Sequence, residues 1–231
     1  MNYDVLASVY DLLVKDDQAT ERWVQFTRRW CPGRRVLELA CGSGEISIAL
    51  ARAGWQVEAT DVSPAMIAAA AAKPHPDTVS FHVMDMRAME DGVWDGILCY
   101  CDSINYLENL EQLQQVAAQA AQRLNRGGVL LFDMHTQDRL QEFAEEFIEE
   151  GYLDQMPYQW TILSDEDRIY QHFAFWSQQG LKEEHHVQTV FDPLQVRAVL
   201  ENNGFAVEIL TDFDQPGIHP GEKLFYVGRK R

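Results

Sequence analysis

An apolar run that leads through a small-residue loop into a helical pattern constrains this chain most. Residues 36–39 are apolar apart from one glutamate, residues 40–44 read Ala-Cys-Gly-Ser-Gly, and residues 46–51 carry helical apolar spacing. This order predicts a strand, a tight glycine turn and a helix. Gly42 and Gly44 lack a Cβ, so a ligand can approach the backbone closely, and the helix N-terminus offers unpaired N–H groups. We therefore expect a nucleotide-like cofactor at this turn.

Strand and helix patterns alternate along most of the chain. The pattern predicts helices within 1–30 and at 45–53, 64–73, 107–124 and 193–203, and strands at 36–39, 56–61, 79–83, 96–100, 129–133, 205–210 and 223–228. Apolar runs bounded by helices are typical of a parallel sheet covered on both faces. The expected fold is α/β, with a doubly wound, mostly parallel seven-stranded sheet.

Residues 136–191 have a different composition and pattern. Glutamates opposite Phe143, Phe147 and Ile148 predict an amphipathic helix at 141–150. Three segments rich in β-branched and aromatic residues follow and predict three antiparallel strands. We expect a cofactor-binding core from 1–135 and 192–231 and a small α+β insertion at 136–191. Its aromatic residues suit either a cover over a substrate or a contact with a second copy of the chain.

Charge and cysteine spacing exclude several functions. The chain has 19 Lys and Arg against 36 Asp and Glu, a net charge of −17, which disfavours nucleic acid and anionic membranes as partners. A basic leader and a membrane-length apolar run are absent, so we expect a soluble cytoplasmic protein. The four cysteines lack the spacing of a zinc or thioredoxin-like site, which predicts reduced thiols and no metal.

Charges beside the glycine turn discriminate between candidate cofactors. A dinucleotide fingerprint that begins at Gly42 needs its third glycine at position 47, where the chain has Ser47. Lys and Arg are absent from 36–51, whereas Glu38 and Glu45 flank the turn. These carboxylates would repel a pyrophosphate but suit the sulfonium and ammonium of S-adenosylmethionine. The turn favours S-adenosylmethionine, and an NAD-dependent oxidoreductase is the alternative.

Acidic residues after the next two strands fit an adenosine. Asp61 ends the second predicted strand, where a carboxylate accepts hydrogen bonds from both ribose hydroxyls. Asp85 and Met86 follow the third strand and place an acceptor and a soft side chain where adenine would rest. Met86 equally suits simple filling of the core.

The chain as a whole resembles the class I S-adenosylmethionine-dependent methyltransferases. Residues 36–44 resemble the family's first motif, Asp61 its second-strand acid, and residues 85–86 its third motif. The final pair of strands is similar to the family's reversed seventh strand. Residues 101–107 and 127–133 resemble a group of small bacterial methyltransferases with a β insertion before the final helix.

The resemblance implies a set of cofactor contacts at the carboxyl ends of the strands. The implied cofactor-binding residues are Tyr10, Glu38, Ala40, Gly42, Gly44, Asp61, Val62, Met66, Asp85, Met86, Cys101 and Asp102. Cys101 and Asp102 would line the methionine end, and Tyr10 would help to cover it. Thr20 stands where the group often has a second tyrosine. From the residues alone, Asp102 equally suits a helix cap and Tyr10 a core position.

Methyl transfer from a sulfonium requires mainly positioning, because the methyl group is already activated. A nucleophile held about 3 Å from the methyl carbon is sufficient. A base helps when the acceptor is an oxygen or a protonated amine, and His135, His185 and His186 are candidates. Asn105 and Tyr106 lie in the right loop to orient an acceptor. We expect a small-molecule acceptor, and a cofactor-binding protein without turnover is the alternative.

Overall fold

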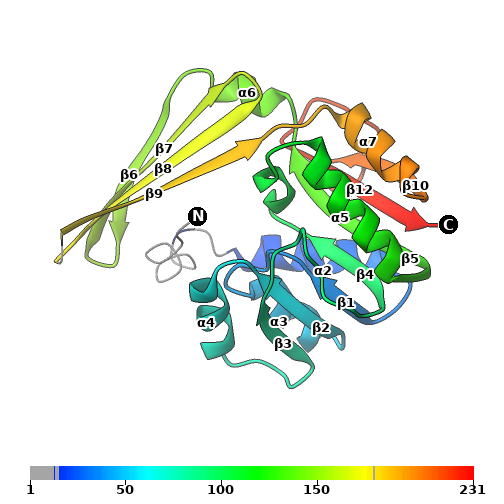
Figure 1. The fold of residues 1–231 in the computed structure, drawn as a ribbon. Coiled ribbons are helices and arrows are strands. Elements are labelled where there is room, and N and C mark those ends of the chain that lie inside the picture. The colour runs from blue at the N-terminus through cyan, green and yellow to red at the C-terminus, as the bar shows by residue number, and fades with distance from the viewer. Residues whose placement is uncertain (1–12, 14–15, 179) are drawn as a thin grey trace.

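The computed structural model describes residues 13, 16–178 and 180–231. The helical pattern expected in the first dozen residues, including Tyr10, lies outside this part of the chain. Two separate sheets form the fold, and Figure 1 shows the smaller sheet extending as an arm beside the core.

The larger sheet has the predicted mostly parallel, doubly wound arrangement. Its strand order is β11-β10-β12-β5-β4-β1-β2-β3. The strands are β1 (Arg35–Glu38), β2 (Gln56–Asp61), β3 (Val79–Val83), β4 (Trp94–Cys99), β5 (Leu124–His135), β10 (Phe205–Thr211), β11 (Gln215–Pro216) and β12 (Lys223–Lys230). Strand β12 runs antiparallel to both of its neighbours, β5 and β10, which confirms the reversed last strand. The two-residue β11 adds a short edge to the seven predicted strands.

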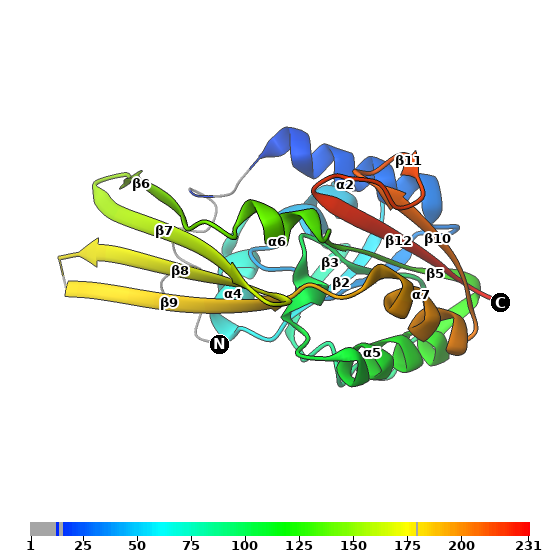
Figure 2. The same ribbon diagram turned by 90° about the horizontal axis from the view of Figure 1, so that it is seen from above.

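Helices cover both faces of this sheet, as Figure 2 shows. They are α2 (Asp17–Trp30), α3 (Glu45–Arg52), α4 (Pro64–Ala72), α5 (Leu110–Arg123) and α7 (Pro193–Asn202). Leucine, valine and alanine side chains of α5 and α7 pack on one face, and Trp23, Val24 and Phe26 of α2 pack with aliphatic side chains of α3 on the other. The cofactor turn therefore lies at the edge of a core that is rigid on both sides.

The insertion differs from the prediction in its first element. Residues 141–150, predicted as one helix, instead end the short α6 (Asp138–Glu142) and begin β6 (Phe147–Leu153). Strand β6 pairs with β7 from Phe147 opposite Ile162 to Leu153 opposite Met156. This backbone pairing outweighs the weak helix preference of the glutamates. The prediction of a helix was wrong at this place.

The insertion sheet consequently has four strands in place of the three predicted. Its order is β6-β7-β8-β9, with β7 (Met156–Asp165), β8 (Arg168–Ser177) and β9 (Gly180–Thr189), and all pairs are antiparallel. Trp160 and Phe173 stack on its inner face, whereas Tyr152 and Trp176 are exposed elsewhere on the arm. The contact with a second copy of the chain stays a prediction.

Two further boundaries differ from the sequence prediction. The helix expected at 107–124 is α5, which begins later, at Leu110, where the Asn109 side chain accepts a hydrogen bond from the Gln112 N–H. A 3₁₀ turn, η1 (Ser103–Tyr106), precedes it. Residues 125–128, which the sequence places between that helix and the strand at 129–133, belong to β5. Gly127 has φ +76°, and the ladder between β4 and β5 shifts register at Trp94 and Gly96, so an irregular strand replaces the expected turn.

The described part of the chain has no helix long and apolar enough to cross a membrane. The same residues contain no cluster of three or more His, Cys, Asp or Glu placed to hold a metal ion.

Candidate active site

The backbone of the tight turn after β1 is left-handed at both of its glycines. Gly42 has φ +54° and Gly44 has φ +79°. A Cβ on Gly44 would lie 2.8 Å from Cε1 of Phe81 and 2.9 Å from Cβ of Ala70. Gly44 is therefore required both by its φ and by close packing against its neighbours.

Asp61 fixes this turn with both of its carboxylate oxygens. Oδ2 accepts from the Gly42 N–H at 2.9 Å, and Oδ1 accepts from the Ser63 N–H at 2.8 Å. A carboxylate oxygen has two acceptor sites, so each still has capacity for a ligand hydroxyl. Burial raises the pKa of Asp61 above its ordinary value, although these backbone N–H groups oppose the shift.

Glu38 lies at the end of β1 and is almost completely buried. Burial raises its pKa to about 7, while a hydrogen bond from the Ser47 hydroxyl lowers it and the charge of Asp61 raises it. Ser47, which replaces a glycine of the dinucleotide fingerprint, therefore has a partner of its own in the site. Glu38 titrates near neutral pH, which makes its charge sensitive to what binds beside it.

The loop after β4 holds two consecutive residues in a strained conformation. Cys101 and Asp102 both have φ +58°, a region that costs non-glycine residues about 1–2 kcal/mol each. The Asp102 N–H donates to Oδ2 of Asp133 at 3.0 Å, and Lys223 Nζ donates to Oδ2 of Asp102 at 2.8 Å and Oδ2 of Asp133 at 3.0 Å. This ionic cluster, Asp102, Asp133 and Lys223, holds the strained turn in place.

The cluster divides its charge unequally between the two carboxyl groups. Burial opposes ionisation of Asp102, but the charges of Lys223 and His135 outweigh it and lower its pKa to about 2. Burial and the neighbouring charge of Asp102 raise the pKa of Asp133 to about 7, against the opposing charge of Lys223. Asp102 is therefore the permanently ionised partner of Lys223 at neutral pH. Its carboxylate does not cap η1, so the capping alternative is excluded.

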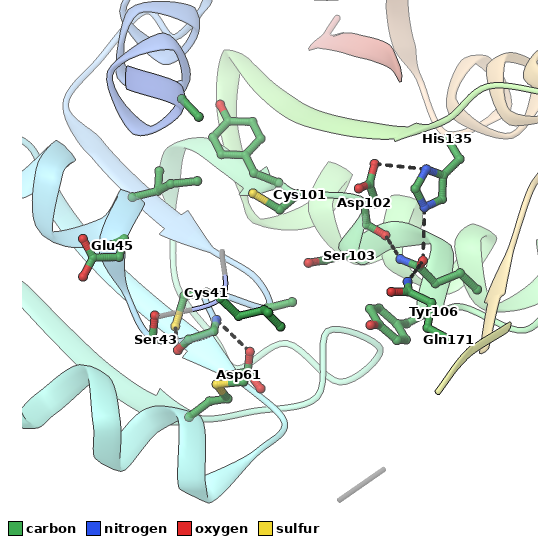
Figure 3. A pocket seen from close by; sticks show the side chains of 18 of the residues that line it. Cys41, Ser43, Glu45, Asp61, Cys101, Asp102, Ser103, Tyr106, His135 and Gln171 are labelled. Atoms are coloured by element: carbon green, nitrogen blue, oxygen red, sulfur yellow. Dashed lines mark hydrogen bonds and ion pairs between the residues drawn. The ribbon is translucent and has the colours of Figure 1, made fainter. Parts of the chain in front are cut away.

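A cavity of about 390 Å³ joins the glycine turn to the insertion. Its walls come from the ends of the core strands and from β7, β8 and β9, and its size is suitable for small molecules. Figure 3 shows Asp61 and Cys41 at one end and Asp102, His135 and Gln171 at the other. The cavity is therefore shared between the core and the insertion.

Most of the sequence-predicted residues meet in this cavity. Those that line it are Glu38, Ala40, Gly42, Asp61, Val62, Met66, Met86, Cys101, Asp102, Tyr106 and His135. Thr20 also lines it. Tyr10 lies outside the described residues.

Three predicted residues have other places in the structure. Gly44 packs beneath the turn, as described above. The carboxylate of Asp85 forms an ion pair with Arg87, at 2.6 Å between Oδ2 and Nη2. Asn105 is completely buried, where Nδ2 donates to the Thr189 carbonyl at 2.6 Å and Oδ1 accepts from the His135 N–H at 3.1 Å. The structure therefore does not bring Asn105 to the cavity, because its side chain joins β5 to β9.

The three candidate histidines have different environments. His135 lines the cavity at the end of β5. His185 lies against His172 with ring centroids 4.4 Å apart, and its neighbour His186 is buried beside Tyr106 with Nδ1 3.4 Å from the tyrosine hydroxyl. Because adjacent strand residues point to opposite faces, His185 and His186 cannot both face the cavity. His135 is the candidate that the cavity selects.

The insertion contributes residues that the sequence could not place. Trp160, Ile162, Gln171, Phe173 and Gln188 line the cavity from β7, β8 and β9. Trp160 and Phe173 belong to the aromatic residues from which the sequence predicts a cover over a substrate or a contact between copies, but composition does not show which face they occupy. Gln171 and Gln188 have no signal in the sequence, because their place depends on how the arm folds over the core.

The chemistry of the cavity fits S-adenosylmethionine. Glu38 and Asp61 supply carboxylates, and Val62, Met66 and Met86 supply an apolar surface. One expectation needs correction, because Glu45 is not uncompensated: Lys73 Nζ lies 2.7 Å from its Oε1. Among the described lining residues, Arg139 is the one Lys or Arg, and it belongs to α6 at the insertion end. A diphosphate would meet no lining cation at the turn itself.

Comparisons with known proteins agree with this geometry. A family model described as "Methyltransferase domain" matches residues 36–128. The protein named "Putative methyltransferase YqeM" of Bacillus subtilis (strain 168) is 31% identical over 245 residues, covering 100% of this chain and 98% of its own.

Solved structures share the whole fold. A S-adenosylmethionine-dependent methyltransferase from Clostridium acetobutylicum ATCC 824 aligns with a TM-score of 0.80 at 20% identity, covering 99% of this chain and 98% of that one. The sugar N-methyltransferase KedS8 from Streptoalloteichus sp ATCC 53650 aligns with a TM-score of 0.78 at 26% identity, covering 98% and 93%.

The full-length relative excludes the oxidoreductase alternative, and the family match falls on the strands and turn that build the cofactor end of the cavity. The chain belongs to the class I S-adenosylmethionine-dependent methyltransferases, and S-adenosylmethionine is its methyl donor.

Proposed function

We propose that the chain methylates a small molecule with a flat apolar body, at a nitrogen or oxygen that carries a proton. The observation that carries this proposal is the one cavity that extends from the glycine turn to the inner face of the insertion sheet. Such a cavity holds donor and acceptor together and excludes water from between them. The similarity to the sugar N-methyltransferase KedS8 supports a small acceptor.

The donor and the acceptor bind at opposite ends of the cavity. The core, 1–135 and 192–231, holds the donor, and the insertion, 136–191, covers the acceptor. The net charge of −17 argues against a nucleic acid as the acceptor.

At the donor end, the proposed contacts are electrostatic and apolar. The remaining acceptor sites of Asp61 bind the ribose hydroxyls, and Val62, Met66 and Met86 surround the adenine. Glu38 faces the ammonium of the methionine part. When bound, S-adenosylmethionine supplies a methyl group activated by a positively charged sulfur.

At the acceptor end, aromatic residues position the nucleophile and His135 accepts its proton. Trp160 and Phe173, with ring centroids 5.2 Å apart, pack against the acceptor body. Tyr106 orients the reacting atom from the η1 turn. That atom's lone pair forms the new bond to the methyl carbon, the carbon–sulfur electron pair stays on sulfur, and the acceptor's proton passes to His135.

A panel of amines, phenols, carboxylates and amino sugars tests the proposal through release of S-adenosylhomocysteine. With an active acceptor, Trp160→Ala should raise the KM for that acceptor about tenfold, equivalent to about 1.4 kcal/mol of lost contact, and leave the Kd for S-adenosylmethionine unchanged. Trp176→Ala is the matched control, because Trp176 is 45% exposed in the same arm and does not line the cavity.

Equal acceptor KM values in the two variants would overturn the assignment of the acceptor to this cavity. Release of product from none of the panel would argue against a small acceptor of this class.

A further inference from the structure

A chain of side-chain hydrogen bonds connects the insertion sheet to His135. Trp160 Nε1 lies 3.1 Å from Gln171 Oε1, and Gln171 Nε2 lies 2.7 Å from Gln188 Oε1. His135 Nε2 lies 3.1 Å from the same Gln188 oxygen. Gln188 Nε2 in turn donates to the backbone carbonyl of Asp102 at 3.3 Å. Figure 3 shows Gln171, Asp102 and His135 at this end of the cavity, with dashed lines for the contacts among the residues drawn.

The direction of every bond in this chain follows from its first member. An indole N–H only donates, so Trp160 requires the oxygen of Gln171 to face it. The Gln171 amide nitrogen therefore points to Gln188 and requires its oxygen. A flipped Gln188 would place its NH₂ against that of Gln171 and its oxygen against a carbonyl. Gln188 Oε1 is thus an acceptor, and His135 Nε2 must carry the hydrogen that it receives.

The second nitrogen of His135 has an opposite character. Nδ1 lies 3.6 Å from Asp102 Oδ1, and within the described residues neither buried atom has a hydrogen-bond partner. Burial lowers the pKa of His135, although the charge of Asp102 and the bond to Gln188 oppose the shift. Neutral His135 therefore holds its proton on Nε2 and leaves a bare lone pair on Nδ1, which is buried against Asp102.

Groups on every neighbouring element determine what a proton on Nδ1 would encounter. Asp102 faces it from the loop after β4, Lys223 from β12 and Arg139 from α6. Lys223 also pairs with Asp133 of β5, so it is shared between two carboxylates. A proton on Nδ1 would satisfy both unpartnered atoms at once, because the imidazolium would donate to Gln188 on one side and to Asp102 on the other.

We propose that Trp160, Gln171 and Gln188 are positioning residues that hold His135 in the Nε2–H tautomer, which keeps the buried Nδ1, beside Asp102, as the nitrogen that takes up the proton released in methyl transfer. The inference rests on the proposed function for the identity of the proton, which leaves the acceptor's nitrogen or oxygen as its lone pair takes the methyl group. Asp102 then serves as the counter-ion of the imidazolium. The insertion therefore sets the protonation state of a core residue as well as covering the acceptor.

Long-range ¹H–¹⁵N NMR of the imidazole nitrogens measures the tautomer directly, without any acceptor. The His135 signal is assigned by its loss in His135→Asn. The wild type should show a protonated Nε2 and a bare Nδ1 at pH 8. Gln188→Leu removes the acceptor of the Nε2–H bond, and the His135 proton should move toward Nδ1, where Asp102 accepts it. Gln159→Leu is the matched control from the same sheet, since Gln159 pairs with Glu150 instead.

Activity gives a second readout that a merely structural role would not change. Activity should fall as pH falls through the pKa of His135, because protonated Nδ1 cannot accept a proton. Gln188→Glu keeps an acceptor for Nε2–H and adds a negative charge, so it should move this acid limb to higher pH. Gln188→Leu should lower kcat about 10²-fold at pH 8 without changing the Kd for S-adenosylmethionine.

A bare Nε2 in the wild type would overturn the inference. The same holds if Gln188→Leu and Gln188→Glu match Gln159→Leu in both tautomer and pH profile. If Gln188→Leu does not fold, Gln171→Leu tests the same series of hydrogen bonds one bond earlier. If the wild type shows the expected tautomer but no turnover, only the proposed function is contradicted. If it shows turnover but the other tautomer, only this inference is contradicted.

Discussion

Replacement of Lys223 removes the one cation of the ionic cluster formed by Asp102, Asp133 and Lys223. Its Nζ contacts Asp102 at 2.8 Å and Asp133 at 3.0 Å, and Asp133 is 0% exposed. At an effective dielectric constant of about 20, each contact is worth about 6 kcal/mol before desolvation is subtracted. Lys223→Met keeps most of the side-chain volume but leaves buried carboxylates without a cation. Such a loss costs about 3–5 kcal/mol of the free energy of unfolding.

The pH dependence of this loss identifies its cause. Asp133 has a folded pKa raised to about 7 from its ordinary value of 3.8, and without Lys223 this pKa should rise further. A raised folded pKa means that the folded state retains a proton that the unfolded chain releases, so stability falls as pH rises toward the folded pKa. In wild type this decline ends near pH 7, whereas in Lys223→Met it should continue above pH 7. The difference between the two proteins should therefore grow by about 1.4 kcal/mol per pH unit.

Urea unfolding of both proteins at pH 5.5 and 8.5 measures these quantities. Lys230→Met is the matched control from the same strand, because Lys230 Nζ contacts the Leu124 carbonyl and no carboxylate in the described chain. Adding Asp133→Asn to Lys223→Met should recover part of the loss by removing the uncompensated charge. A loss below about 1 kcal/mol that is equal at both pH values would refute the reasoning.

Three further predictions concern the donor end. Asp61→Ala should weaken S-adenosylmethionine binding at least about tenfold by calorimetry, and unchanged affinity would contradict the ribose contact. Because the pKa of Glu38 is raised to about 7, the affinity for S-adenosylmethionine should fall as pH drops through 7 and Glu38 becomes neutral. Calorimetry from pH 5.5 to 8.5 measures this affinity, and a constant affinity would mean that the ammonium lies elsewhere. Gly44→Ala should lower the free energy of unfolding in urea by about 2–4 kcal/mol. The loss should exceed that of Gly127→Ala, because Gly127 has a similar φ of +76° but nothing within 4 Å of its added Cβ. Equal losses would mean that packing against Phe81 is unimportant.

The core could be predicted because its signals are local. Each apolar run between helical patterns forms one strand of the mostly parallel sheet, and Gly42 and Gly44 lie in the predicted tight turn. Asp61 could be placed because the carboxyl ends of parallel strands share one edge of the sheet. These inferences need only short-range patterns and one general rule of topology.

The insertion was harder to predict because its structure depends on pairing between distant segments. Glu149 and Glu150 favour a helix locally, but pairing with β7 places them in a strand, where Glu149 accepts from the Tyr158 hydroxyl. Gln171 and Gln188 carry no motif, and their importance arises only when β8 and β9 fold over the cofactor loop. Asn105 lies in the predicted loop, but its side-chain amide forms hydrogen bonds with the backbone of β9 and β5.

A crystal structure with bound S-adenosylhomocysteine tests the central claim most directly, because it locates the donor and the acceptor space together. The account predicts the ribose at Asp61, the homocysteine amine toward Glu38, and the sulfur facing the space beneath Trp160 and beside His135. A ligand whose sulfur is walled off from Trp160 and His135, or whose adenosine lies away from Gly42 and Asp61, would contradict it.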